Sequence, residues 1–196
     1  MLFNKPHLIV FGGNSGNRAE NDVWLLNILK GPFSWQKYEF QSKIIPSPRV
    51  YHSAAICEEG SAFGMMVVFG GRKETKKDHN GSQKELSVAA LNDIWGLRKH
   101  RDGSWDWVTP PKSETYTPVA RYQHLVCFMG SMMIIMGGRS NNPDEHVSLM
   151  EVYDTEKSEW TRFNSLTRYR HAIALYNKTQ LFVHGGFEPD LASQPL

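Results

Sequence analysis

The feature that most constrains this sequence is a short apolar run that ends in two glycines and occurs four times. The four copies are HLIVFGG (7–13), MMVVFGG (65–71), MMIIMGG (132–138) and QLFVHGG (180–186). Successive copies lie 58, 67 and 48 residues apart. These spacings indicate a repeat of about 50 residues that two insertions lengthen, so the chain is predicted to be an array of similar small units.

Two other motifs recur in phase with the glycine pairs. Arg-x-x-His and a first apolar run precede three of them, and an acidic residue with an aromatic two positions later follows three, as in NDVWLL (21–26), NDIWGL (92–97) and MEVYDT (150–155). Each of these leads to a tryptophan. The runs are short, β-branched and aromatic, and bounded by turn residues, whereas no segment has a sustained helical period. Four strands per repeat is the composition of a propeller blade.

The order of these motifs resembles the kelch repeat across nearly the whole chain. The resemblance implies an all-β fold, a kelch β-propeller with blades of four antiparallel strands. We predict about three blades plus part of a fourth, in approximate repeats 1–45, 46–117, 118–164 and 165–196. The first repeat is expected to lack its opening strand and the last to contain only two strands. About six blades would form the ring, so the chain is expected to be part of a longer protein.

A narrower resemblance comes from three segments, NDIWGLRKHRDGSWDWVTPP (92–111), PVARYQH (118–124) and PSPRVYHSAA (46–55). They are similar to the kelch region of the protein serine/threonine phosphatases with kelch-like domains, which occur in plants, as the brassinosteroid-signalling phosphatases, and in apicomplexan protists. The resemblance implies a parent enzyme that hydrolyses phosphoserine and phosphothreonine with a dinuclear metal site such as manganese or iron. The core motifs of that enzyme, which begin with Gly-Asp, are missing, because the sequence has no Gly-Asp dipeptide. We therefore expect no catalytic residue, metal or cofactor in this chain.

The function implied by this resemblance is protein interaction. The chain would recognise substrates or regulators for the phosphatase, and the enzyme's own phosphatase domain is a further candidate partner. An alternative is a kelch substrate receptor for ubiquitin ligation or a cytoskeletal scaffold.

The recurring glycines, histidines and tryptophans have structural interpretations. No helix follows the glycine pairs, so a phosphate-binding loop is disfavoured, and glycine serves instead for close backbone approach. His52, His124 and His171 recur once per repeat, which favours packing or hydrogen bonding over metal ligation. We expect His184 in the core, and Trp35, Trp107 and Trp160 between blades.

Strand alternation predicts where a partner would bind. In an antiparallel four-stranded blade, the connection into the first strand and the loop between the second and third strands emerge on the same face. The cationic side chains of that face are expected to bind an acidic or phosphorylated segment of a partner protein, since arginine suits carboxylates and phosphates. The predicted partner-binding residues are Arg49, Arg121, Arg168, Arg72, Arg139, Arg18 and Lys73. In the alternative, the Arg-x-x-His arginines are tied into hydrogen bonds between blades.

Composition limits the remaining possibilities. The net charge of +2 gives no reason to expect nucleic acid as a partner. The longest apolar stretch, 125–136, is shorter than the roughly 18 residues that span a bilayer, so no membrane partner is expected. Cys57 and Cys127 sit in apolar runs without metal-ligand spacing and no secretory signal is visible, which favours an intracellular protein, cytoplasmic or nuclear. Uncovered blade edges predict a homodimer or strand exchange.

Overall fold

The structure, a computed structural model, describes residues 2–4, 6–16, 18–77, 85–111, 113, 116–142, 147 and 149–188. Every regular element in these ranges is a β-strand. None of the described residues forms a helix long and apolar enough to cross a membrane. The prediction of an all-β fold built from antiparallel strands is confirmed.

The strands form three four-stranded sheets and one two-stranded sheet, each in sequence order. The first sheet contains β1 (Leu2–Asn4), β2 (His7–Asn14), β3 (Ala19–Asn27) and β4 (Gln36–Tyr38). The second contains β5 (Ser53–Ile56), β6 (Met66–Lys77), β7 (Glu85–Lys99) and β8 (Trp105–Val108). The third contains β9 (Leu125–Met129), β10 (Met132–Met136), β11 (Leu149–Asp154) and β12 (Glu159–Asn164). The last contains β13 (Ala172–Tyr176) and β14 (Gln180–His184). We call these sheets blades 1 to 4.

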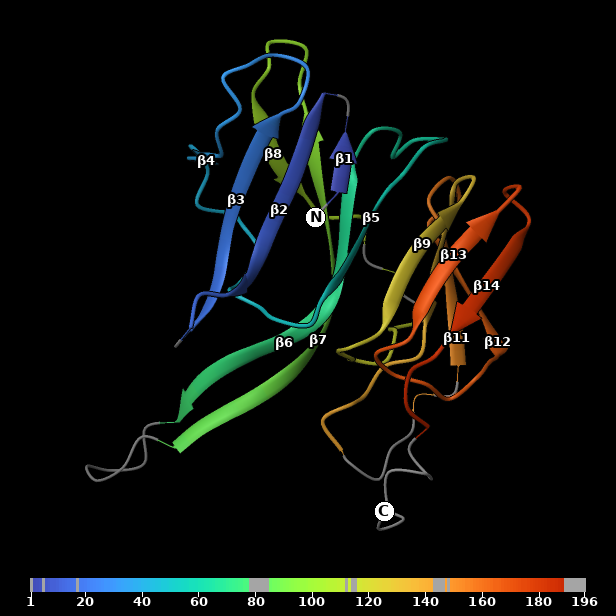
Figure 1. Cartoon of the computed structure of the whole chain (residues 1–196). Helices are drawn as coiled ribbons and strands as arrows, with labels where there is room; N and C mark the ends of the chain where they lie inside the picture. The colour runs from blue at the N-terminus through green and yellow to red at the C-terminus, as the bar shows by residue number, and fades with distance from the viewer. Residues whose placement is uncertain are drawn as a thin grey trace.

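The blades stand beside one another, with their opening strands β1, β5, β9 and β13 in succession (Figure 1). Blade 1 differs from the sequence prediction, because β1 supplies the opening strand that seemed to be missing. Leu2 pairs with Ile9 and Asn4 with His7, although β1 carries neither the Arg-x-x-His motif nor a long apolar run. A three-residue strand gives little pattern, so the sequence did not reveal it.

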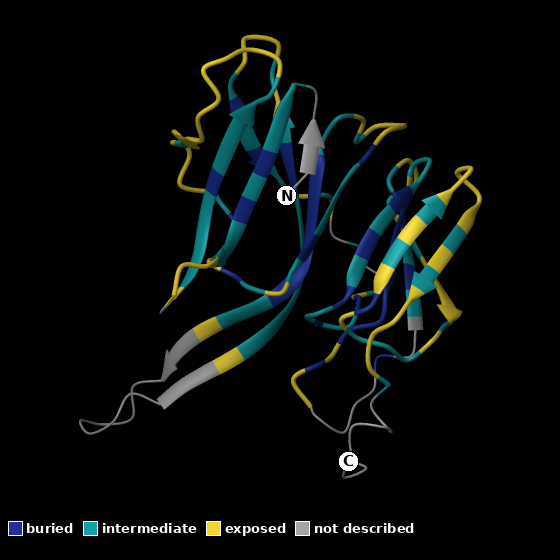
Figure 2. Cartoon of the chain, in the orientation of Figure 1, coloured by how far each residue is buried: buried dark blue, intermediate teal, exposed yellow. Residues whose placement is uncertain are grey.

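The core lies between blades rather than inside one sheet. Along β6, Met66 and Val68 pack toward blade 1 with Ile9, whereas Val67 and Phe69 pack toward blade 3. Successive side chains of a strand point to opposite faces, so a strand with a blade on each side is apolar at every position. This explains the uninterrupted apolar runs. Figure 2 shows the buried segments concentrated in the middle blades and exposed bands on β13 and β14.

The tryptophans fit this packing only in part. Trp107 is buried against Phe11 of blade 1, with ring centroids 4.9 Å apart. Trp160 packs against the cluster between blades 2 and 3, and its ring centroid lies 5.0 Å from that of Tyr153. The prediction that Trp35 packs between blades is wrong, since this residue precedes β4 and is 42% exposed. The core position expected for His184 is also wrong, because that side chain is exposed on the uncovered blade 4.

Candidate functional site

The connections into β5, β9 and β13 each meet the residue that follows a Gly-Gly pair. Isolated bridges join Val50 to Arg72, Tyr122 to Arg139 and Tyr169 to Phe187. These pairings bring the Arg-x-x-His segments and the residues after the Gly-Gly pairs to one face. In blade 2 these residues are not in a loop as predicted, because β6 and β7 extend beyond Gly71 and include Arg72. The three bridges agree with the strand argument that these segments lie together, whereas partner binding at this face stays a prediction. We call this face the Arg-x-x-His face.

Arg49 and Arg121 do not point outward from this face. Both residues are 0% exposed. Arg49 donates from Nη1 to the carbonyl oxygen of Gly70, at 3.0 Å, and makes two bonds to Asp93, at 2.7 and 2.8 Å. Arg121 donates to the carbonyl of Gly137 and forms a fully buried ion pair with Glu151. The direct partner-binding role predicted for Arg49 and Arg121 does not fit these positions.

The same arrangement recurs in blade 4 with more solvent access. Arg168 donates to the carbonyl of Gly185 at 3.0 Å and to Glu188 at 2.8 Å, and 31% of its side chain is exposed. In all three repeats the guanidinium reaches the first glycine of the pair and a carboxylate. For Arg49 and Arg121, both the glycine carbonyl and the carboxylate belong to the same blade as the arginine. Their side-chain bonds thus stabilise single blades. Their backbone groups, however, link two blades, as the alternative prediction expected: Arg49 bonds to Gly13 and Glu20 of blade 1, and Arg121 to Gly71 and Leu91 of blade 2.

The carboxylates of both ion pairs also bind neighbouring polar groups. Trp95 Nε1 also donates to Asp93, at 2.7 Å. Burial favours the neutral form of Asp93, but the bonds from Arg49 and Trp95 outweigh it and lower the pKa of this carboxyl group. Tyr116 donates its hydroxyl to Glu151. Burial first, and then this bond, raise the pKa of Tyr116 to about 12.

The motif histidines act as packing residues between blades. His124 Nε2 lies 3.1 Å from the carbonyl oxygen of Phe69 in the preceding blade, and the two rings pack edge to face. Burial, followed by the charge of Arg121, lowers the pKa of His124 to about 3. Burial and then Arg49 lower that of His52 to about 4. Burial likewise lowers the pKa of His171.

The glycine pairs allow two close backbone approaches, as expected from the sequence. A Cβ on Gly70 would lie 2.8 Å from the carbonyl oxygen of Arg121 in the next blade, and one on Gly71 would lie 2.8 Å from His52 Cβ in its own blade. Both glycines have positive φ. The N–H groups of Gly71 and Gly138 donate to the carbonyl oxygens of Arg121 and Arg168 in the next blades, so they are not available to a phosphate. The described residues contain no group of three or more potential metal-ligating side chains.

What the Arg-x-x-His face does present is a row of alternating arginine and tyrosine side chains. The guanidinium carbon of Arg72 lies 5.7 Å from the ring centroid of Tyr122. That of Arg139 lies 6.0 Å from Tyr122 and 5.1 Å from Tyr169. These distances are within the range of cation–π contacts. We call Arg72, Tyr122, Arg139 and Tyr169 the arginine–tyrosine ladder.

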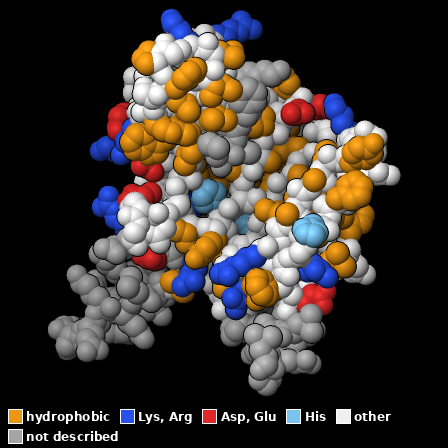
Figure 3. Space-filling view, in the orientation of Figure 1, with side chains coloured by type: hydrophobic (Ala, Val, Ile, Leu, Met, Phe, Trp, Pro, Cys, Tyr) orange, Lys and Arg blue, Asp and Glu red, His pale blue; other side chains and the backbone are white. Residues whose placement is uncertain are grey.

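Two exposed aromatic residues contact the tyrosines of the ladder. Tyr51 is 51% exposed and its ring lies 6.4 Å from Tyr122, while Phe187 is 54% exposed and stacks on Tyr169 at 5.5 Å. Among the residues that the structure describes, no salt bridge engages Arg72 or Arg139. Figure 3 shows blue and orange side chains together at the lower edge of the molecule, between the two grey segments.

The sequence prediction included the arginines of the ladder but not its aromatic residues. Their signal was present, because the position after the motif arginine is tyrosine in two of three repeats (Tyr122 and Tyr169). The remaining predicted cations lie apart. Arg18 is highly exposed but forms an ion pair with Glu20 at 2.7 Å. Lys73 is half-buried on β6, opposite Ala89.

Comparisons with known proteins agree with this architecture. A family model described as the KLHDC2/KLHL20/DRC7 Kelch-repeats domain matches residues 1–194. The chain is 30% identical over 161 residues to serine/threonine-protein phosphatase BSL2 of Arabidopsis thaliana, a match that covers 81% of this chain and 14% of the phosphatase. It is 22% identical to protein ral2 of Schizosaccharomyces pombe (89% of this chain, 29% of ral2) and 27% identical to tip elongation aberrant protein 1 of the same yeast (67% and 10%).

These relatives are all much longer than the matched region, since the chain spans less than a third of each. Their names describe different roles, and the repeat is what this chain shares with them. The in-phase motifs, the four-stranded sheets and the match over residues 1–194 show that the chain belongs to the kelch-repeat family.

Proposed function

We propose that this chain is a protein-interaction module whose arginine–tyrosine ladder binds an acidic or phosphorylated protein segment. The observation that carries the proposal is Arg139, an exposed guanidinium held between Tyr122 and Tyr169 on the Arg-x-x-His face. Arginine and tyrosine dominate the binding energy of many protein interfaces. A guanidinium steadied by aromatic rings offers its planar set of donors at little entropic cost, which suits a carboxylate or a phosphate.

The buried arginines support this site indirectly. Arg49 and Arg121 brace the backbone at the two glycine pairs beside the ladder, at Gly70 and Gly137. Arg72 and Arg139 follow these pairs within two residues. Binding groups that stand on a rigid scaffold lose less freedom when a partner binds, so the arrangement favours recognition by Arg72 and Arg139.

The parent protein in this proposal is a serine/threonine phosphatase. The similarity to BSL2 supports it, and so does the segment NDIWGLRKHRDGSWDWVTPP. The sequence lacks the Gly-Asp dipeptides with which the metal-binding motifs of such an enzyme begin, so in this proposal the metals bind outside this chain. The module would then select substrates or regulators inside the cell, or contact the phosphatase domain itself. A ubiquitin-ligase receptor or a cytoskeletal scaffold would use the same face.

A binding experiment with matched peptides tests the ladder. Fluorescence anisotropy would follow a labelled nine-residue peptide with a central phosphoserine flanked by glutamates, and the same peptide with lysines in place of the glutamates and serine in place of phosphoserine. We expect the acidic phosphopeptide to bind and the basic peptide not to bind. Arg72→Ala with Arg139→Ala should weaken binding at least tenfold.

Arg18→Ala is the matched control for this experiment. It removes one positive charge from a loop of blade 1 that lies outside the ladder. Equal loss of binding affinity in the control and in the ladder variants would mean that the peptide responds to the net charge of the chain rather than to the ladder. Unchanged binding after both ladder substitutions would contradict the proposal.

We also infer that two copies associate through blade 4. Strand β14 pairs only with β13 among the described strands, and alternate side chains on both are exposed. Tyr176 and Phe182 are 55% and 57% exposed. An unpaired strand edge beside exposed aromatic side chains favours association with another chain.

A further inference from the structure

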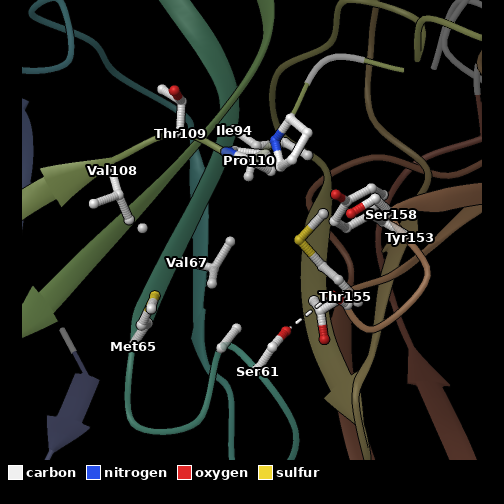
Figure 4. A pocket seen from close by; sticks show the side chains of 14 residues that line it. Ser61, Met65, Val67, Ile94, Val108, Thr109, Pro110, Tyr153, Thr155 and Ser158 are labelled. Carbon is white, nitrogen blue, oxygen red and sulfur yellow. Dashed lines mark hydrogen bonds between the residues drawn. The ribbon is translucent and has the colours of Figure 1, made fainter. Parts of the chain in front are cut away.

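A cavity of about 200 Å³ lies between blades 2 and 3, outside the Arg-x-x-His face. Met65, Val67 and Ile94 line it from blade 2, and Met133 and Tyr153 line it from blade 3. In Figure 4, Met65 and Val108 stand on one side and Tyr153 and Ser158 on the other. Nothing in the kelch architecture discussed above requires an open space between these two blades.

The cavity has a defined polar end. Ser61 Oγ donates to the carbonyl oxygen of Thr155 at 2.9 Å, a bond that ties the loop between β5 and β6 to the loop between β11 and β12. The backbone N–H of Ser61 also donates to Glu156. Thr109 and Pro110 stand at the opposite end (Figure 4). Because contacts hold the two loops together, the cavity is a formed feature rather than a gap between independent loops.

Its size and lining select the kind of occupant. Pockets for drug-sized molecules usually measure about 300–1,000 Å³, so a cavity of this size suits one bulky apolar side chain. Phe63, in the loop next to Ala62 and Met65, is 71% exposed and adds apolar surface beside the cavity. An anchoring side chain in a mostly apolar pocket is the usual centre of a peptide-binding site.

The surroundings of the cavity are acidic. Glu156 accepts a hydrogen bond from the backbone N–H of Ser61, which lines the cavity, and Glu58 and Glu59 precede Ser61 in the same loop. All three carboxylates are exposed. Lys178 pairs with Glu59 at 2.9 Å. Lys157, next to Glu156, pairs with Asp154 at 3.9 Å. Among the described residues, no salt bridge engages Glu58 or Glu156, so the rim keeps a net negative charge that would attract cationic residues.

We propose that this cavity is a second peptide-binding site, which takes one bulky apolar side chain flanked by lysine or arginine. Its charge preference is opposite to that of the arginine–tyrosine ladder, and the two sites use different loops. A partner with an acidic and a basic-apolar segment could thus engage both faces of the module. The proposal does not depend on the ladder, so either site can fail in experiments without the other.

Two labelled nine-residue peptides test the site on the full chain. One has a central phenylalanine between pairs of lysines, and the other has alanine at the centre. We expect the phenylalanine peptide to bind at least tenfold more tightly. In a ¹⁵N-labelled chain, it should shift the amide signals of Ala62, Met65, Thr155 and Ser158. Binding that does not distinguish the two peptides would overturn the proposal.

Two substitutions locate the binding. Ala62→Leu should fill the cavity, and Glu58→Lys should reverse one rim charge. Each substitution should weaken binding of the phenylalanine peptide at least fivefold. Glu39→Lys, an equal charge change on blade 1, is the control and should leave binding unchanged. Circular dichroism and thermal melting must show that Ala62→Leu remains folded; if it does not, Glu58→Lys against Glu39→Lys decides. Binding of a glutamate-flanked peptide to the same amides would also contradict the site.

Discussion

Arg49 and Asp93, 44 residues apart in sequence, are joined by two parallel hydrogen bonds, from Nη1 to Oδ1 at 2.7 Å and from Nη2 to Oδ2 at 2.8 Å. Arg121 and Glu151 form an ion pair at the equivalent place in blade 3, where both side chains are fully buried. Each pair ties the segment before a blade's first strand to its third strand. The side chain of the motif arginine therefore stabilises its own blade, while its backbone N–H and carbonyl groups bond to the preceding blade.

Replacing Arg121 by alanine should destabilise the protein strongly. The substitution leaves Glu151 buried without its counter-ion, and breaking a buried ion pair in this way costs about 3–5 kcal/mol. Urea unfolding followed by tryptophan fluorescence measures the change. Arg168→Ala is the comparison, because that arginine is partly exposed and should lose about 1 kcal/mol or less. An Arg121→Ala protein as stable as Arg168→Ala would contradict the buried role.

Stability should fall as the pH drops from about 6.5 toward 4. His52 and His124 have pKa values lowered to about 4 and about 3, so they stay neutral in the folded protein while the unfolded chain binds protons near pH 6.5. The unfolded state then holds more protons, and each histidine costs up to about 1.4 kcal/mol per pH unit in this window. Urea midpoints measured at several pH values would show the slope.

His124→Gln tests the origin of that slope. Removing the titrating ring should reduce the loss of stability between pH 6.5 and 4, whatever the substitution does to stability at neutral pH. His184→Gln, at an exposed position, should leave the slope unchanged. A slope that is equal in both variants would mean that other groups cause the acid sensitivity.

Much of the fold could be predicted from the sequence because the same order of strand motifs occurs in several repeats. The runs ending at Gly70 and Gly137 are apolar at every position since a blade lies on each side, and these runs became β6 and β10. The interblade role of His124 was also predictable, because a residue that recurs in phase occupies the same environment in every blade.

The burial of Arg49 and Arg121 could not be predicted from the sequence. Whether Arg49 faces a partner or the core depends on Asp93, and Asp93 was interpreted only as part of the Asp-x-Trp strand motif. The tyrosines of the ladder were missed for a related reason. Tyr122 meets Arg139 only because a bridge pairs the two segments after folding. A pattern along the chain identifies strands better than it identifies contacts between their ends.

Gly137 and Gly185 should respond differently to alanine. Both have positive φ, 65° and 67°, so each substitution places a Cβ in a left-handed conformation and costs about 1–2 kcal/mol. A Cβ on Gly137 would also collide with the carbonyl oxygen of Arg168 in the next blade, whereas one on Gly185 meets nothing within 4 Å. Gly137→Ala should therefore lose at least twice as much stability in urea. Equal losses would mean that close approach between blades contributes nothing.

The association of two copies through blade 4 should depend on Phe182. This ring is 57% exposed on β14, so replacing it by lysine removes apolar contact area and adds a charge without disturbing a core. Light scattering coupled to size-exclusion chromatography should give twice the chain mass of 22.4 kDa for the unaltered protein and the single mass for Phe182→Lys. Phe63→Lys makes the same chemical change at a residue that is 71% exposed on blade 2, and it should leave the dimer intact. A monomer at every concentration of the unaltered chain would show that the exposed rings of blade 4 do not pair copies. Dissociation by both variants would place the interface elsewhere.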